Sequence, residues 1–159
     1  MRIKVKYLDP KVPRLAHIGG KRKSNWVDVY ASRIEIDGKM VDMDVLQDMA
    51  LQINERCILR VFLGFALQLP AGYEAHIAPR SSTFRNTGLI MTNSIGIVDE
   101  SFCGDGDEWF TPFWGAEPGL IKRYDRIAQF RIVEAMPDVE WVEVDKLGNA
   151  DRGGYGSTG

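Results

Sequence analysis

One stretch of the sequence combines groups that can bind and activate a small molecule: residues 93–102, NSIGIVDESF. Its apolar ribbon leads directly into the carboxylate of Asp99 and then to the ring of Phe102. A hairpin in the first half of the stretch would present main-chain donors and acceptors at its mouth, with one carboxylate at the rim. A lone Asp after a short Ile/Val run is also typical of a solvated strand end, so this stretch alone does not decide between the two interpretations.

Further motifs on both sides of this stretch carry groups that suit phosphate chemistry: residues 78–82 read APRSS, residues 124–130 read YDRIAQF, and residues 151–159 read DRGGYGSTG. Arg80 beside the hydroxyls of Ser81 and Ser82 can bind an anion at a helix start or tight turn. Taken alone, the same motif favours a surface ion pair for Arg80 and a helix cap for Ser81. The glycines at the end of the chain let a backbone approach phosphates closely.

In this order, the motifs resemble those of the trimeric all-β dUTP pyrophosphatases, the dUTPases. Residues 26–32, WVDVYAS, are similar to the family's first motif, with Asp28 at its Asp position. The resemblance implies an all-β, jelly-roll-like fold with a short helical insertion, assembled as a homotrimer with shared active sites. It also divides the chain into a β domain, residues 1–150, and a mobile glycine-rich C-terminal motif, residues 151–159.

The resemblance implies hydrolysis of dUTP to dUMP and pyrophosphate, which keeps uracil out of DNA and supplies dUMP. Asp99 would orient and deprotonate a water for in-line attack on the α-phosphate, and Gln129 would bind that water or a phosphate. Asp28 would support the site, and the implied substrate-binding residues are Arg80, Ser81, Ser82, Asn93, Gly96, Val98, Phe102, Arg126, Arg152, Tyr155, Gly156, Ser157 and Thr158. Mg²⁺ is the expected cofactor, held mainly by phosphate oxygens and waters, with no direct protein ligand.

Some positions depart from the family pattern: Ser82 and Tyr124 stand where glycine is usual, and Phe102 where tyrosine is usual. The ring at 102 can still block a 2′-hydroxyl, but any bond made by the phenol is lost. Arg152 lies two residues later than the family's arginine. The link after Phe102 is long, as in dUTPases of Gram-positive bacteria and their phages, so Trp109 or Phe110 is a candidate to cover the base together with Tyr155.

The composition suits one domain: 159 residues, 45% hydrophobic and 26% charged. A net charge of −2 gives no general basic field for nucleic acid. Cys57 and Cys103 form no CxxC pair and, with only two histidines, make a zinc site improbable. The first residues are charged and alternating, and no run reaches the length of a membrane span. We therefore expect a cytoplasmic protein with neither a membrane nor a nucleic-acid partner.

Hydrophobic periodicity predicts mostly strands, because many short apolar runs are separated by turn residues. Gly64, in the middle of the run 57–69, marks a bulge or a close approach of another backbone. Residues 37–50 instead have the spacing of one or two helical turns after a turn at Asp37–Gly38. The predicted strands are residues 2–8, 26–32, 57–69, 73–78, 88–91, 95–98, 108–114, 126–133 and 139–144.

Two alternative functions stay open. A dCTP deaminase shares the fold and a triphosphate pocket, but it needs an acid/base group near the base, for which Glu100 is the obvious acidic neighbour in the ribbon. A regulatory module of the phage type would instead bind a protein partner and use the nucleotide as a switch. The intact set of Asp99, Ser81 and Gln129 favours the hydrolase.

Overall fold

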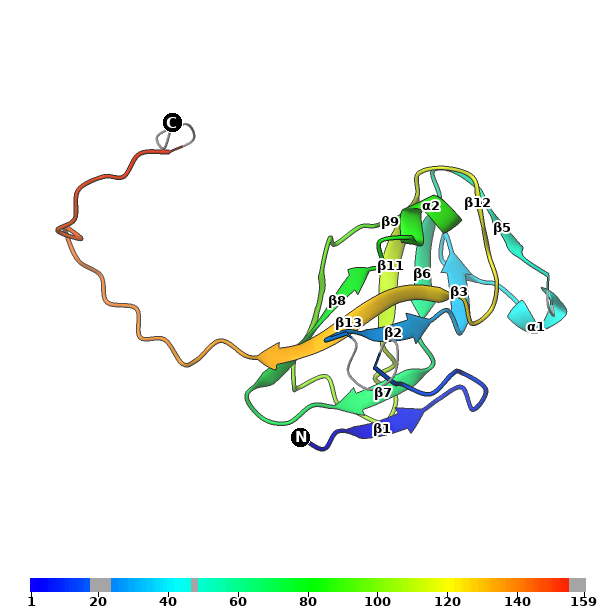
Figure 1. Ribbon diagram of the computed structural model, residues 1–159, viewed down its shortest axis with the longest axis horizontal. Helices are drawn as coiled ribbons and strands as arrows, with labels where there is room; N and C mark the ends of the chain where they lie inside the picture. The colour runs from blue at the N-terminus through cyan, green and yellow to red at the C-terminus, as the bar shows by residue number, and fades with distance from the viewer. Residues whose placement is uncertain (18–23, 47–48, 155–159) are drawn as a thin grey trace.

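The computed structural model describes residues 1–17, 24–46 and 49–154, and there the chain is all β apart from two short helices (Figure 1). The expected all-β class is confirmed. The helices are α1 (Met43–Leu46) and α2 (Thr83–Thr87). The strands are β1 (Lys4–Tyr7), β2 (Val27–Tyr30), β3 (Arg33–Ile36), β4 (Lys39–Met40), β5 (Leu51–Ile53), β6 (Ile58–Phe62), β7 (Phe65–Gln68), β8 (Tyr73–Pro79), β9 (Leu89–Met91), β10 (Gly96–Val98), β11 (Phe110–Gly115), β12 (Gly119–Ile121) and β13 (Arg126–Glu134).

Two antiparallel sheets supply most of the core. One has the strand order β10-β8-β13-β2 and the other β4-β3-β6-β11-β9, while β1 pairs with β7 and β12 with β5. Alternate side chains of both larger sheets enter one hydrophobic cluster, as expected for antiparallel strands with one buried face. Leu59 and Phe113 come from the second sheet and Ile77 from the first, and each is at most 1% exposed.

Gly64 divides the apolar run 57–69 into β6 and β7. Its φ is +78°, and a Cβ there would lie 3.0 Å from the Cβ of Ser32 and 3.1 Å from that of Asp9. The backbone N–H groups of Leu8 and Asp9 also donate to the carbonyl of Gly64, at 2.8 and 3.1 Å, so the predicted close approach of another backbone is confirmed. The break lets one apolar run contribute strands to two different sheets.

The insertion after β3 contains one helical turn, α1, so the helical prediction for this segment is confirmed in part. The Asp37–Gly38 turn closes a hairpin between β3 and β4, which the periodicity did not reveal. The Oδ1 of Asp42 accepts hydrogen bonds from the backbone N–H groups of residues 44 and 45, at 3.1 and 3.2 Å. These bonds satisfy donors that a helix start leaves free.

The predicted strand at residues 139–144 is wrong. β13 ends at Glu134, and the following residues up to 154 form no strand and lead away from the body (Figure 1). Trp141 and Leu147 there are 84% and 87% exposed. A strand requires a hydrogen-bonded neighbour, and the described part of this single chain places none beside the segment.

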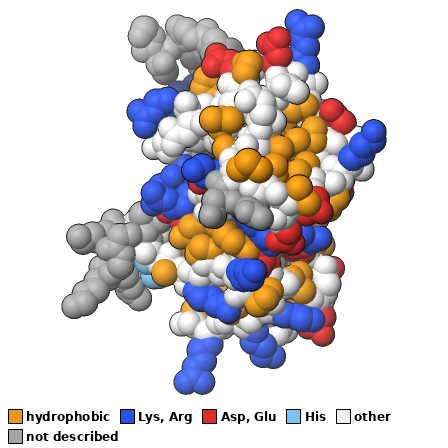
Figure 2. Space-filling model, turned by 90° about the vertical axis from the view of Figure 1, so that its right-hand side faces the viewer, with side chains coloured by type: hydrophobic (Ala, Val, Ile, Leu, Met, Phe, Trp, Pro, Cys, Tyr) orange, Lys and Arg blue, Asp and Glu red, His pale blue; other side chains and the backbone are white. Residues whose placement is uncertain are grey.

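The remaining surface is mixed in character. No helix in the described ranges is long and apolar enough to cross a membrane. The side that carries α1, β5 and β12 faces the viewer in Figure 2, where Lys and Arg, Asp and Glu, and hydrophobic side chains are interspersed. No single sign of charge covers this face.

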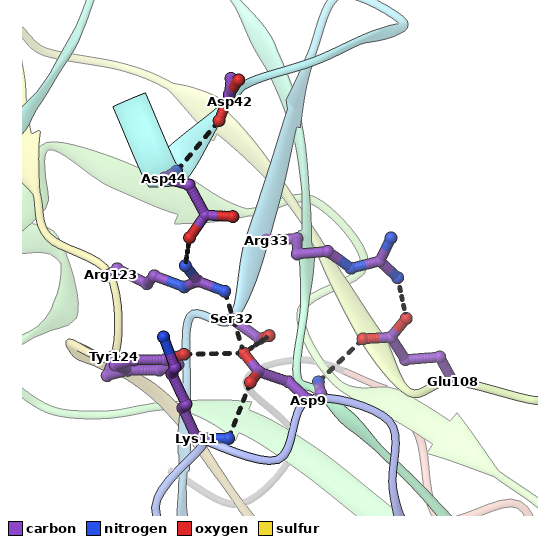
Figure 3. A network of polar contacts seen from close by, with 10 residues as sticks. Asp9, Lys11, Ser32, Arg33, Asp42, Asp44, Glu108, Arg123 and Tyr124 are labelled. Atoms are coloured by element: carbon purple, nitrogen blue, oxygen red, sulfur yellow. Dashed lines mark hydrogen bonds and ion pairs between the residues drawn. The ribbon is translucent and has the colours of Figure 1, made fainter. Parts of the chain in front are cut away.

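A buried carboxylate, Asp9, ties the N-terminal loop to the turn that precedes β13 (Figure 3). It accepts hydrogen bonds from the hydroxyl of Ser32 at 2.6 Å and the hydroxyl of Tyr124 at 2.9 Å, and Arg123 lies 3.3 Å away. Arg123 also pairs with Asp44 of α1. The network therefore fixes the insertion, the N-terminal loop and the turn to one another.

Tyr124 adopts a left-handed backbone conformation, with φ of +64°, which is strained for any residue with a Cβ. A left-handed conformation suits glycine, the residue that the family resemblance leads us to expect at this position. The bond from its hydroxyl to Asp9 holds the strained residue in place. Burial and this bond raise the pKa of Tyr124 to about 12. Burial raises the pKa of Asp9, but the hydrogen bonds from Ser32, Lys11 and Tyr124 outweigh it and hold that pKa below its ordinary value.

We expect Tyr124→Phe to lower the free energy of unfolding by about 1 to 3 kcal/mol, because the variant keeps the strained backbone and loses a bond to a carboxylate. Chemical denaturation monitored by circular dichroism measures the change. Tyr73→Phe is the matched control, since the Tyr73 hydroxyl makes no side-chain hydrogen bond among the described residues. Equal stability of the two variants would contradict the role given to the Tyr124 bond.

Candidate active site

A cavity of about 420 Å³ brings together the predicted residues of the central stretch. We name it the arch pocket, and its volume lies in the range of small-molecule sites. Its predicted members come from one short segment of the chain, whereas the opposite wall is built by β8 and β11. It is lined by Ile77, Asn93, Gly96, Ile97, Val98, Asp99, Phe102, Trp109, Phe110 and Pro112.

The ribbon that forms this pocket is an arch between two sheets, so the predicted hairpin is wrong. β9 pairs with β11, whereas β10 pairs with β8. The amide of Thr92 likewise bonds to the carbonyl of Pro112, at 3.2 Å. Because each arm is paired in a different sheet, the two arms splay apart, and the main chain of the arch borders the cavity between them.

Asp99 follows β10 in a turn that fixes its carboxylate. Its Oδ1 accepts two bonds from Ser101, from the backbone N–H at 2.8 Å and from the hydroxyl at 2.5 Å. Its Oδ2 accepts no hydrogen bond from the described residues and is open to a water. The side-chain bond from Ser101 is the largest cause that holds the pKa of Asp99 below its ordinary value. Sequence reasoning missed Ser101, although an Asp followed two residues later by Ser is a signal for such a turn.

The aromatic residues around the pocket differ in how far they are exposed. Trp109 is 1% exposed, and its ring packs against Phe65 and Phe130 with centroids 5.5 and 5.3 Å apart. It forms part of the pocket wall, and its share in covering the base stays a prediction. Phe102 and Phe110 are 38% and 41% exposed, and both have room to contact a ligand.

A second group of predicted residues forms what we name the arginine cluster, at the far end of β8. The Nε of Arg80 donates to Asp28 Oδ1 at 2.7 Å, and an Arg126 nitrogen lies 3.5 Å from Asp28 Oδ2. Gln129 lies opposite Asp28 on β13 and donates to the carbonyl of Pro79 at 3.3 Å. Two guanidinium groups share one buried carboxylate, which leaves a net positive charge that can bind an anion.

The alternative interpretation of this motif was a surface ion pair for Arg80 and a helix cap for Ser81, and the structure differs from it at both residues. Arg80 does form an ion pair, but with a buried carboxylate from β2. Ser82, not Ser81, is the N-cap residue of α2, and its side chain makes no cap bond. Ser81 is exposed, and its hydroxyl bonds to none of the described residues. It is therefore available to a ligand.

The arch pocket and the arginine cluster lie apart within one chain. β10 pairs Val98 with Ala75 on β8, which places Asp99 level with Glu74. Arg80 lies six residues further along the same chain direction, or roughly 20 Å at the rise of a strand. One nucleotide therefore cannot make short contacts with both groups of the same chain.

The remaining predicted residues belong to the C-terminal segment. Arg152 is exposed in the extended part that leaves the body, and it contacts neither group. Tyr155, Gly156, Ser157 and Thr158 lie outside the described residues. Within the ranges that the structure describes, no group of three or more His, Cys, Asp or Glu side chains is placed to hold a metal ion.

Comparison with known proteins gives a consistent result. A family model described as dUTPase matches residues 40–159. The chain is 46% identical over 159 residues to the SPbeta prophage-derived deoxyuridine 5′-triphosphate nucleotidohydrolase of Bacillus subtilis (strain 168), and the match covers 100% of this chain and 99% of that protein.

Solved structures share the fold at low sequence identity. The Staphylococcus bacteriophage 80alpha dUTPase with dUPNHPP is 16% identical, has a TM-score of 0.73, and is matched over 99% of this chain and 98% of its own. A variant dUTPase from phage phi11 of S. aureus, described with a coordinated structural Mg(II) ion, is 14% identical with a TM-score of 0.68, over 92% of this chain and 99% of its own.

We expect Ser101→Ala to raise the pKa of Asp99, because it removes the largest cause that lowers it. As the pH falls, the carboxylate of the variant then takes up its proton at a higher pH than that of the unchanged protein. Carbon NMR of the carboxyl group, recorded across pH, measures the shift. Ser94→Ala, in the same arch, is the control that leaves this pKa in place. An unchanged titration in Ser101→Ala would show that the hydroxyl does not stabilise the carboxylate.

Proposed function

The chain belongs to the dUTPase family, and from that membership we propose that it hydrolyses dUTP to dUMP and pyrophosphate. The observation that carries the proposal is the pair of sites built from the family's motifs. A pocket with an ordered carboxylate suits the nucleoside end, and a cluster of arginines suits the triphosphate. Neither group alone would suffice for this reaction.

The arch pocket accepts the base and sugar. Main-chain groups of Asn93, Gly96 and Val98 read the edge of uracil, and cytosine would leave buried polar groups unpaired. The ring of Phe102 lies against the deoxyribose and excludes a 2′-hydroxyl. Phe110, on the opposite wall, covers the base together with the residues of the C-terminal segment.

The arginine cluster binds the phosphates. Arg80 and Arg126 neutralise negative charge on the transferred group, and Asp28 holds both guanidinium groups in position. Ser81 donates its hydroxyl to the bridge between the α- and β-phosphates, and Ser82 lies beside it. Gln129 donates to a phosphate oxygen or to the attacking water. Arg152, with the glycines and hydroxyls of the last residues, closes over the β- and γ-phosphates.

Asp99 orients the attacking water through its free Oδ2. The water oxygen forms a bond to the α-phosphorus while the bond to the bridging oxygen breaks, and pyrophosphate leaves with that electron pair. The water's proton passes to Asp99 and then to solvent, which reaches this exposed carboxylate. The low pKa keeps Asp99 ionised at neutral pH, so it is ready to accept the proton.

The substrate is the magnesium complex of the triphosphate. Mg²⁺ would be held mainly by phosphate oxygens and waters. When bound, it supplies charge neutralisation along the phosphates. No step is assigned to a metal held by protein side chains.

The active unit is a homotrimer with sites shared between subunits. The separation of the arch pocket from the arginine cluster supports this, because a neighbouring copy must supply the missing half. Free thiols at Cys57 and Cys103 suit a reducing cytoplasm.

The alternative functions receive less support. Glu100, the acid/base residue that a deaminase would need, accepts a bond from the backbone N–H of Gly72 and is held in a turn. A regulatory protein partner of the phage type stays a prediction for this chain. An assay of the products would discriminate the deaminase directly, since a deaminase releases ammonia and not pyrophosphate.

We expect Asp99→Asn to lower kcat for dUTP by roughly 10²- to 10⁴-fold, because the amide cannot accept the water's proton. The affinity for a non-hydrolysable dUTP analogue should stay close to that of the unchanged protein. Pyrophosphate release across dUTP, dCTP, dTTP and UTP measures activity and selectivity together, and dUTP should be strongly preferred.

The control is Asp105→Asn, which removes a carboxylate that is 92% exposed in the loop after the pocket and should leave kcat unchanged. Full activity in Asp99→Asn would refute the role of this carboxylate. An unchanged protein that leaves dUTP intact in the presence of Mg²⁺ would refute the proposed function itself.

A further inference from the structure

One buried hydroxyl lies between the two backbone segments that carry the arginine cluster. It belongs to Thr83, the first residue of α2, which is 3% exposed. A threonine hydroxyl has one proton to donate and lone pairs that accept, so it can join two backbone groups at once. A buried polar group is costly unless it is paired, and the partners of this hydroxyl therefore influence where both segments lie.

The first partner is the backbone of Arg80. The N–H of Arg80 donates to Oγ1 of Thr83 at 3.0 Å, and the N–H of Thr83 donates to the carbonyl of Arg80, also at 3.0 Å. One residue thus holds both backbone polar groups of Arg80. This hold is needed because the ladder between β8 and β13 has its last pair at Pro79 and Ala128, and Arg80 lies beyond it.

The second partner lies next to Arg126 on β13. The hydroxyl of Thr83 donates to the carbonyl of Ile127 at 2.9 Å. β13 shifts its register against β2 between Arg126 and Ala128, and Ile127 is the residue between them. Such an irregularity interrupts the regular ladder locally. Thr83 therefore fastens the chain at the point where the ladder with β2 is interrupted.

The position of each backbone matters because the two arginine side chains meet at one carboxylate. The Nε of Arg80 donates to Asp28 Oδ1 at 2.7 Å, and a nitrogen of Arg126 lies 3.5 Å from Oδ2. If either backbone moves, its guanidinium group leaves this geometry or pulls Asp28 with it. A misplacement of about 1 Å can cost roughly 100-fold in rate when groups must be aligned with a reacting centre.

We propose that Thr83 is a positioning residue for the phosphate half of the site. Its hydroxyl joins the backbone of Arg80 to that of Ile127 and so sets the spacing of the two guanidinium groups. The inference rests on the proposed function, which gives these arginines the triphosphate. Thr83 itself does not touch the ligand, because its side chain is buried and its hydroxyl both donates and accepts within the protein.

The test uses three variants of the full-length protein: Thr83→Val, Thr83→Ser and Thr87→Val. Valine keeps the branched shape and removes the hydroxyl, whereas serine keeps the hydroxyl. Thr87 is the matched control, a threonine one turn further along α2 that is 5% exposed and donates to the carbonyl of Thr83 at 2.7 Å. Circular dichroism verifies folding, and chemical denaturation measures the stability that each variant loses.

We expect kcat/KM for dUTP to fall by about 10- to 100-fold in Thr83→Val, because the arginines are no longer aligned. Thr83→Ser should restore most of the activity, and Thr87→Val should keep the value of the unchanged protein. A second readout does not depend on activity: nitrogen NMR follows the exchange of the Arg80 Nε–H with water. This exchange should become faster in Thr83→Val alone, since only there is the bond to Asp28 loosened.

Two outcomes would overturn the proposal. In one, Thr83→Val is folded and keeps the kcat/KM of the unchanged protein. In the other, Thr83→Val and Thr87→Val lose activity in proportion to their loss of stability, so Thr83 only stabilises α2. Failure of the proposed function looks different: the unchanged protein leaves dUTP intact, while the exchange of the Arg80 Nε–H still responds to Thr83→Val.

Should Thr83→Val be unfolded, Thr83→Cys gives the same two readouts. A thiol is close in size to the hydroxyl but is a weak donor and a weak acceptor. The loss of kcat/KM and the faster exchange at Arg80 are therefore expected in this variant as well, and their absence in folded Thr83→Cys would contradict the proposal.

Discussion

The pairing of β8 with both of its neighbours is the constraint on which the arrangement of the site depends. β10 is hydrogen-bonded to residues 75–77 in the middle of β8 and delivers Asp99 at one end, while the end of β8 delivers Arg80 at the other. β13 runs along the whole of β8 and places Gln129 beside Arg80. Because the rise per residue of a strand is nearly fixed, this register keeps the arch pocket, proposed for the nucleoside, apart from the arginine cluster, proposed for the phosphates. Within one chain, the fold therefore keeps the two groups apart.

Contacts to charged side chains fix the geometry of the arginine cluster and of the arch pocket independently of each other. In the arginine cluster, the buried carboxylate of Asp28 holds two guanidinium groups that would otherwise repel each other. At the pocket, Ser101 anchors one oxygen of Asp99 and leaves the other open. In both cases, a side chain outside the proposed reaction fixes the geometry of one that takes part in it.

Much of the fold could be predicted from the sequence, because alternating apolar residues and turn residues determine strands and turns through their immediate neighbours in the chain. Gly64 was informative for the same reason, since a glycine in an apolar run indicates a close backbone approach. Two predictions failed where the outcome depends on distant partners. The arch at 93–98 looks like a hairpin locally, but its arms pair with different sheets, and the segment 139–144 has a strand-like composition without a neighbour in its own chain. The resemblance to the family suggested the candidate site residues, but only the strand register showed that they lie in two groups.

The central claim is that these two groups work together only between chains, and mixing two inactive variants tests it most directly. Asp99→Asn disables the arch pocket, and Arg80→Ala disables the arginine cluster. When the two are unfolded together, refolded and assayed for pyrophosphate release from dUTP, random assembly restores about one quarter of the sites if each site takes its halves from different copies. Activity that stays at the level of the separate variants, in assemblies shown to contain both chains, would contradict the account, because every site built within one chain keeps one damaged half.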